Sequence, residues 1–130
     1  MTKRMLQSYR WLRMDITHLE EKLAELDSMA RKMTTSMTGM PHGSSNIQDR
    51  MAETVTKIVD VQIEINDKVL ESLERISQIE QSINCLPPRE QIIMRKRYID
   101  CMEWEQICVD MCYGWRQIHS IHSEALKAIS

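Results

Sequence analysis

Hydrophobic residues alternate at steps of four and three along the first quarter of the chain. The positions are Met5, Tyr9, Leu12, Ile16, Leu19, Leu23, Leu26, Ala30 and Met33. Because an unbroken repeat of this kind keeps one face of a helix apolar, it predicts a single helix from about residue 3 to 33. At ~1.5 Å per residue such a helix is roughly 45 Å long, which is too long for a compact bundle of this size.

Residues 34–46 interrupt the repeat. Gly39, Pro41 and Gly43 lie among Ser and Thr residues and predict a loop, which is long for a helix connection and so either mobile or a docking feature. A second helix is expected from about 47 to 84, with Ser45 or Asn46 as its N-cap. Its stripe comprises Met51, Val55, Ile58, Ile65, Val69, Leu73, Ile76, Ile79 and Ile83, widened by Val61, Ile63 and Leu70. A stripe this wide predicts two neighbours, namely the first helix in an antiparallel, coiled-coil-like hairpin and a second copy of the chain.

The last third of the chain has a different pattern. Pro87 and Pro88 end the long helix, and three short helices are expected over residues 88–99, 103–111 and 115–129, with a turn at Cys112. This is the pattern of a helix-turn-helix, in which one helix braces the next so that its exposed face can enter a DNA groove. The sequence therefore predicts an all-α protein with an oligomerising hairpin over residues 1–84 and a helix-turn-helix module over residues 85–130. The module's core is thin, so we expect it to dock onto the hairpin.

Composition supports an all-helical chain without a membrane segment. Among 130 residues there are eleven Met, three Gly, three Pro and no Phe. No apolar stretch approaches the ~20 residues of a membrane span, and the first residues do not form a secretory signal. We therefore expect a cytoplasmic protein with no membrane partner.

The charge balance limits how a nucleic acid could be bound. The net charge is −2, and residues 85–130 contain six basic and six acidic residues. A neutral module binds DNA only if its basic groups gather on one face, with modest affinity for each module. Dimerisation would double the phosphate contacts, so a homo-oligomer, most simply a dimer, is expected.

The predicted recognition helix has a polar side that suits the DNA major groove. Arg116 and Gln117 lie in its first turn, where Arg pairs with guanine and Gln with adenine, each pair contributing ~1–3 kcal/mol of discrimination. Trp115 would pack on sugar or a thymine methyl, or else act as a hinge plug against the first helix. The whole predicted DNA-binding set is Trp115, Arg116, Gln117, His119, Ser120 and Ser123, with Arg95, Lys96 and Arg97 as phosphate contacts. The alternative interpretation of these residues is an ordinary solvated helix face.

Several short motifs of this region resemble a known family. Leu86-Pro87-x-Arg89-Glu90, Arg97-Tyr98 and Trp104-Glu105-x-Ile107 resemble the fourth region of bacterial sigma factors. The resemblance covers the last third of the chain and implies recognition of a promoter element and a contact with RNA polymerase.

The whole layout, with Ser-Met-Thr-Gly-Met-Pro in the loop and Tyr113-x-Trp115-Arg116-Gln117-Ile118-His119-x-Ile121-His122 near the end, is similar to the ArpU and RinA groups of phage late-gene regulators. That resemblance implies a phage or prophage transcription regulator acting in a bacterial host cell. The chain departs from the sigma pattern at the helix caps, where Glu103 and Gly114 replace Ser, and at Cys112, which replaces the turn Gly. Cys112 is therefore expected in a left-handed or altered turn.

Other chemistry has little support in the sequence. Cys108 and Cys112 with His119 and His122 do not have the spacing of a zinc finger, so no metal is expected, and His122 is better interpreted as a core histidine bonded to backbone. There is no catalytic constellation and no phosphate-binding glycine loop, so neither an enzyme nor a cofactor is predicted. Two alternatives to a regulator remain, a subunit of DNA packaging resembling a small terminase, and a helical adaptor that docks on RNA polymerase without binding DNA.

Overall fold

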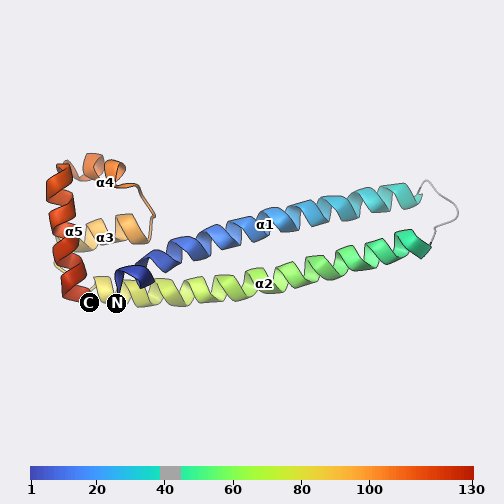
Figure 1. The fold of residues 1–130 in the computed structure, drawn as a ribbon, viewed down its shortest axis with the longest axis horizontal. Coiled ribbons are helices and arrows are strands. Elements are labelled where there is room, and N and C mark those ends of the chain that lie inside the picture. The colour runs from blue at the N-terminus through green and yellow to red at the C-terminus, as the bar shows by residue number, and fades with distance from the viewer. Residues whose placement is uncertain (39–44) are drawn as a thin grey trace. The chain divides into compact units, whose positions relative to one another are not determined.

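The computed structural model describes residues 1–38 and 45–130, and the described chain is all-α as predicted (Figure 1). Five helices follow one another, and no strand occurs within the described residues. Their bounds are α1 (Lys3–Thr38), α2 (Ser45–Ile83), α3 (Pro88–Tyr98), α4 (Trp104–Met111) and α5 (Trp115–Ile129).

The short helices match the sequence prediction to within one residue, whereas α1 is longer than predicted. The pattern placed its end near Met33, but the helix continues to Thr38. The hydroxyls of Thr34 and Thr35 donate to the carbonyls of Ala30 and Arg31, at 3.0 and 3.1 Å, so both side chains are satisfied along the helix. Residues 39–44 of the predicted loop lie outside the described residues, as do the side chains of the two predicted caps, residues 45 and 46.

The chain divides into two compact units, and their boundaries are not the predicted boundary between a hairpin over residues 1–84 and a module over residues 85–130. The hairpin unit is residues 14–70, and the head unit is residues 1–13 together with 71–130. The sequence-based division at residue 84 assigned both ends of the long helices to the hairpin. In the structure these ends pack with the three short helices.

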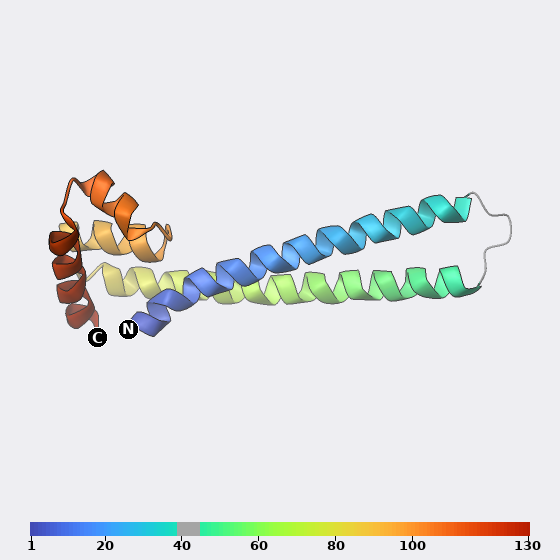
Figure 2. The same cartoon turned by 45° about the horizontal axis from the view of Figure 1, so that its top comes forward.

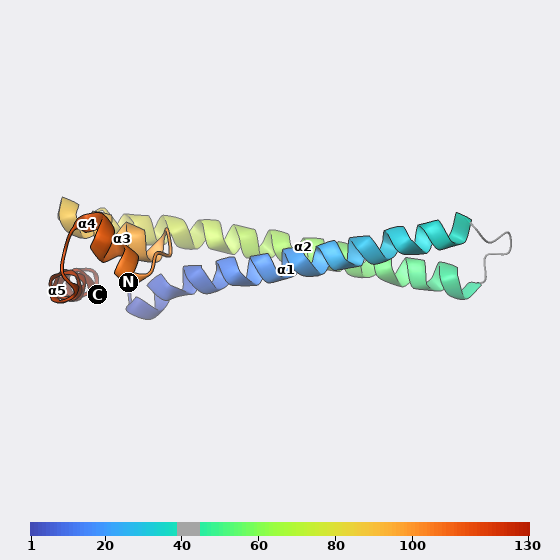
Figure 3. The same cartoon turned by 90° about the horizontal axis from the view of Figure 1, so that it is seen from above.

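In the hairpin unit, residues 14–38 of α1 and 45–70 of α2 run antiparallel, side by side (Figure 3). Its core consists of Leu19, Leu26 and Val61, with half-buried Leu23, Ile58 and Ile65 around them. Lys68 of α2 forms an ion pair with Asp15 of α1 at 3.8 Å.

The face that α2 turns toward α1 differs from the predicted stripe. The buried and half-buried positions are Met51, Thr54, Ile58, Val61, Ile65, Lys68 and Val69, of which the first six follow one another at alternating steps of three and four. Val55, which the prediction assigned to the main stripe, is exposed, and Val61, assigned to a second face, is buried. The sequence prediction therefore mixed residues from two faces of the helix.

The head unit has a core built from segments far apart in the chain (Figure 2). Its larger cluster joins both long helices to α3 and α5 through Leu6, Tyr9, Ile79, Ile83, Leu86, Met94, Tyr98 and Ala125. The N-terminal amine donates to the carbonyl of Ile129 at 3.0 Å, and Arg10 pairs with Glu103 at 3.2 Å. A smaller cluster of Ile93, Ile107, Ile118 and Ile121 packs α4 and α5 against α3.

Candidate nucleic-acid interface

The turn between α4 and α5 has the backbone conformation expected for a helix-turn-helix with its glycine replaced. Cys112 is left-handed, with φ 57° and ψ 36°. Its N–H donates to Val109 O at 3.3 Å, and the N–H of Tyr113 donates to Cys108 O at 3.1 Å, which is the bonding pattern of a Schellman motif. The expected left-handed turn at Cys112 is thus observed. A second cysteine, Cys101, which follows α3, also has φ 57°.

Neither α4 nor α5 begins with a side-chain cap. Glu103 and Gly114 occupy the N-cap positions in extended conformation, and neither forms a capping hydrogen bond, as the substitutions for Ser suggested. The first N–H groups of a helix without such a cap are open to solvent or to an anion. The start of α5, which carries Trp115, Arg116 and Gln117, is therefore open to a ligand.

One face of α5 is polar and exposed along its whole length. Arg116, Ser120, Ser123 and Lys127 are all exposed and follow one another at steps of four, three and four, which places them in one row. Gln117 is exposed beside this row, and Trp115 is 53 % exposed at its start. The arrangement brings five of the predicted DNA contacts to one open surface, with a basic residue at each end of the row.

The opposite face of α5 is buried and fixed by a polar contact. Nε2 of His122 lies 2.6 Å from the hydroxyl oxygen of Tyr98. Burial is the main cause that lowers the pKa of His122 to about 4 and raises that of Tyr98 to about 12, so both groups are neutral at physiological pH. The sequence prediction of a core histidine is confirmed, but its partner is the Tyr98 hydroxyl and not the backbone.

His119 lies beside the exposed row and not on it. Its half-buried ring is 4.8 Å from that of Trp104 and 4.4 Å from that of Trp115, measured between centroids. Its Nε2 is buried and has no hydrogen-bond partner within the described part of the chain. His119 thus packs between the rings of Trp104 and Trp115, although it belongs to the predicted set of groove contacts.

The three basic residues predicted as phosphate contacts are half-buried at the end of α3 and have partners within the head unit. Arg95 donates to Oδ1 of Asn84 at 2.7 Å, and Lys96 pairs with Asp110 at 3.6 Å. Arg97 donates to Met102 O at 2.9 Å and stacks on the ring of Trp104 at 4.8 Å. Arg95 is thus tied to the segment before α3, Lys96 to α4, and Arg97 to the loop between α3 and α4, so all three side chains already have partners.

Two lysines that the sequence analysis did not include lie near the far end of α5. Lys127 ends the exposed row, and Lys3 and Lys127 line one hollow of about 300 Å³ with Met1, Thr2, Leu126 and Ser130. Lys127 could have been found from its spacing, because it follows Arg116 by eleven residues, which is close to three full helical turns. Lys3 could not, because only the tertiary fold brings residue 3 to α5.

Charge is unevenly divided between the two units. The head unit contains eleven basic and nine acidic residues, and the hairpin unit six basic and ten acidic. The net charge of −2 is therefore the sum of +2 on the head unit and −4 on the hairpin unit. Phosphate attraction favours the head unit alone as the nucleic-acid surface.

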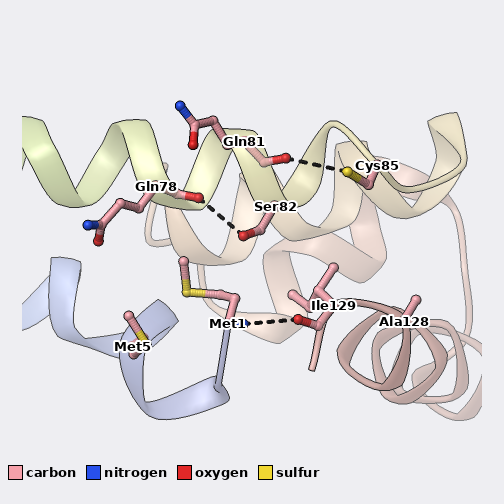
Figure 4. Close-up of a pocket in the computed structure, with 8 residues that line it drawn as sticks. All are labelled: Met1, Met5, Gln78, Gln81, Ser82, Cys85, Ala128 and Ile129. Carbon is pink, nitrogen blue, oxygen red and sulfur yellow. Dashed lines mark hydrogen bonds between the residues drawn. The ribbon is translucent and has the colours of Figure 1, made fainter.

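A larger hollow of about 510 Å³ lies in the head unit between residues of α1, α2 and α5 (Figure 4). Its lining is Met1, Met5, Gln78, Gln81, Ser82, Cys85, Ala128 and Ile129. The Cys85 thiol donates a hydrogen bond to Gln81 O, and the Ser82 hydroxyl donates one to Gln78 O. Both donors are therefore satisfied by carbonyls of α2. The hollow has no carboxylate or imidazole and suggests no chemistry of its own.

Neither a metal site nor a membrane span was found in residues 1–38 and 45–130. No group of three or more His, Cys, Asp or Glu side chains is placed to hold an ion, and no described helix is both long and apolar enough to cross a bilayer. Comparisons with protein-family models, curated proteins and solved structures gave no match to this chain. Any family assignment therefore depends on the motifs alone.

Proposed function

We propose that this protein is a sequence-specific DNA-binding transcription regulator that inserts α5 into the major groove. The observation that supports this best is the polar row on α5, because all its residues are exposed while the other side of the same helix is packed in the core. A brace of this kind is what a recognition helix requires. The function is the one implied by the resemblance to sigma-like phage regulators.

The proposal assigns each exposed residue a role. Arg116 and Gln117 would contact base edges near the start of α5, with Ser120 one turn further along. Trp115 would pack on sugar or on a thymine methyl. Lys127 and Lys3 would contact phosphates at the other end. Arg95, Lys96 and Arg97 could bind phosphate only by exchanging their present partners, so the proposal depends on them less.

Partners follow from the same resemblance. A sigma-like module implies a contact with RNA polymerase and a place of action in the cytoplasm of a bacterial host. The head unit has a net charge of only +2, with eleven basic and nine acidic residues, which implies weak binding by one module; a homo-oligomer, most simply a dimer, would double the contacts. We expect neither an enzymatic activity nor a cofactor.

Gel-shift titration against selected genomic DNA fragments tests the proposal. Arg116→Ala should weaken specific binding about 10-fold or more, since a bidentate Arg–guanine pair contributes about 1–3 kcal/mol. Lys127→Ala should weaken binding to all sequences and reduce the salt dependence by about one phosphate. Lys22→Ala, an exposed lysine of the hairpin unit, is the matched control and should change neither.

Two other outcomes would replace the proposal. If the wild-type protein shows no salt-sensitive DNA binding, an adaptor that docks on RNA polymerase becomes the better interpretation. A ring of eight or more subunits in native mass measurement would favour a packaging subunit like a small terminase. Binding that is unchanged by Arg116→Ala would contradict the recognition face assigned here.

A further inference from the structure

A second apolar stripe runs along the outer side of α2 in the hairpin unit. Val55, Val59, Ile63 and Leu70 are 48, 46, 55 and 66 % exposed. They recur at steps of four, four and seven, and exposed Asn66 fills the remaining position between Ile63 and Leu70. These five residues are called the outer α2 stripe. An isolated exposed valine is common on a protein surface, but four aliphatic side chains in one row over more than four helical turns indicate a binding surface.

The charged residues of α2 are distributed unevenly around this stripe. With 3.6 residues per turn, Asp49, Asp60 and Asp67 lie along one edge of it, with Glu53 and Glu64 further round on that side. Arg50, Lys57 and Lys68 lie on the opposite side of the helix. The other edge is formed by Gln62 and half-buried Val69, which carry no charge. The stripe thus has one acidic edge and one neutral edge.

We propose that the outer α2 stripe is the contact between two copies of this chain, packed as parallel helices about a two-fold axis. In a parallel pair related by that symmetry, the acidic edge of each helix faces the neutral edge of its partner. In an antiparallel pair the two acidic edges lie against each other, and the repulsion of like charges opposes it. The charge distribution therefore selects the direction of the pair.

Asn66 fits the same arrangement. A single asparagine within an apolar seam fixes the register and the number of strands in parallel coiled coils, because it pairs with the same residue of the partner. In a two-fold parallel pair, Asn66 of each copy meets Asn66 of the other. The other members of the stripe, Val55, Val59, Ile63 and Leu70, are all aliphatic.

The size of the surface is sufficient for a reversible dimer. Four half-exposed aliphatic side chains from each copy, with the methylene groups beside them, would bury on the order of 1,000 Å² in total, near the lower limit of a specific interface. The dimer should therefore dissociate on dilution.

Sedimentation velocity of the full chain over a concentration series tests the contact. The wild type should pass from monomer to dimer, and Ile63→Glu and Val59→Glu should shift that transition to at least about 10-fold higher concentration. Met29→Glu is the matched control, since it places the same charge on another half-exposed residue of this unit and should leave the dimer unchanged. Circular dichroism should show equal helix content in all four proteins.

Cysteine cross-linking tests the direction. In a background of Cys85→Ser and Cys112→Ser, which removes the two exposed thiols, Asn66→Cys should form a disulfide-linked dimer on mild oxidation. Glu64→Cys, which lies away from the stripe, should not. A wild type that stays monomeric, a dimer unaffected by Ile63→Glu, or equal cross-linking at both positions would overturn the inference. These measurements use no DNA, so they can fail or succeed independently of the proposed function.

Discussion

The hydroxyl oxygen of Tyr98 and Nε2 of His122, 2.6 Å apart, join α3 to α5 inside the head unit. The same imidazole lies edge-on to the ring of Trp104 of α4, with centroids 4.6 Å apart. Three helices thus meet at one side chain. Because this contact fixes the rotation of α5 about its own axis, it determines that Arg116 and Ser120 point away from the core.

Removing the Tyr98 hydroxyl should destabilise the head unit. Tyr98→Phe keeps the ring but leaves a buried imidazole nitrogen without its partner, which costs about 1–3 kcal/mol. Urea denaturation followed by circular dichroism would measure the loss. Tyr9→Phe removes the same group from another core tyrosine of the head unit, whose hydroxyl has no hydrogen bond within residues 1–38 and 45–130, and it serves as the control. Equal effects of the two substitutions would show that the Tyr98–His122 bond contributes nothing specific.

Stability should also depend on pH through His122. Its pKa is near 4 in the folded state and near 6.5 when unfolded, so between these values the unfolded chain binds more protons. The stabilisation is therefore complete above about pH 6.5 and is lost progressively as the pH falls toward 4, by up to about 3 kcal/mol. Unfolding free energies measured at pH 7 and pH 4.5 should differ in this direction. His122→Asn should reduce the difference, and His18→Asn, at an exposed position, should not.

Cys112→Gly should stabilise the turn before α5. A non-glycine residue in the left-handed conformation costs about 1–2 kcal/mol, part of which is offset by the greater freedom of glycine in the unfolded chain. We expect a net gain of about 0.5–1 kcal/mol in thermal or chemical denaturation. Cys108→Gly, within α4, should instead lose about 1 kcal/mol. A loss at both positions would mean that the cysteine at 112 makes contacts worth more than the strain.

Arg97 and Arg116 should behave in opposite ways. Arg97→Ala removes the bond to Met102 O and the stacking on Trp104, so we expect a loss of about 1–3 kcal/mol in stability. Arg116→Ala, on the open face of α5, should change stability by less than about 0.5 kcal/mol while weakening DNA binding. Unchanged stability with lost DNA binding in Arg97→Ala would restore that residue as a phosphate contact.

Apolar periodicity, together with the breaks at Pro87 and Pro88 and in the predicted loop, was enough to predict the helices of this chain, although α1 continues five residues beyond its predicted end at Met33. Apolar spacing located α3, α4 and α5 to within one residue and indicated both long helices, because helical spacing depends on local sequence. It was less reliable in choosing faces. Met5 was assigned to the seam of α1, but Leu6 is the buried residue, since the helix end packs into the head unit and not onto the hairpin.

The candidate site could be predicted only in part. Arg116, Gln117, Ser120 and Ser123 are exposed as expected because they alternate with the buried Ile118, Ile121 and His122. His119 and Arg97 depend on tertiary contacts with Trp104, a residue of another helix, and no local pattern reveals such contacts. The same holds for Lys3, which lies more than 120 residues from Lys127 in the chain.

The bond between the Met1 amine and the carbonyl of Ile129 has a consequence for the order of folding. Leu6 and Tyr9 share one core cluster with Ala125, which lies more than 110 residues further along the sequence. The two segments of the head unit can therefore complete their common core only after a loop that contains the whole hairpin unit has closed. Contacts at such a sequence separation slow folding, so the head unit should become ordered more slowly than the hairpin unit, whose two helices are close in sequence.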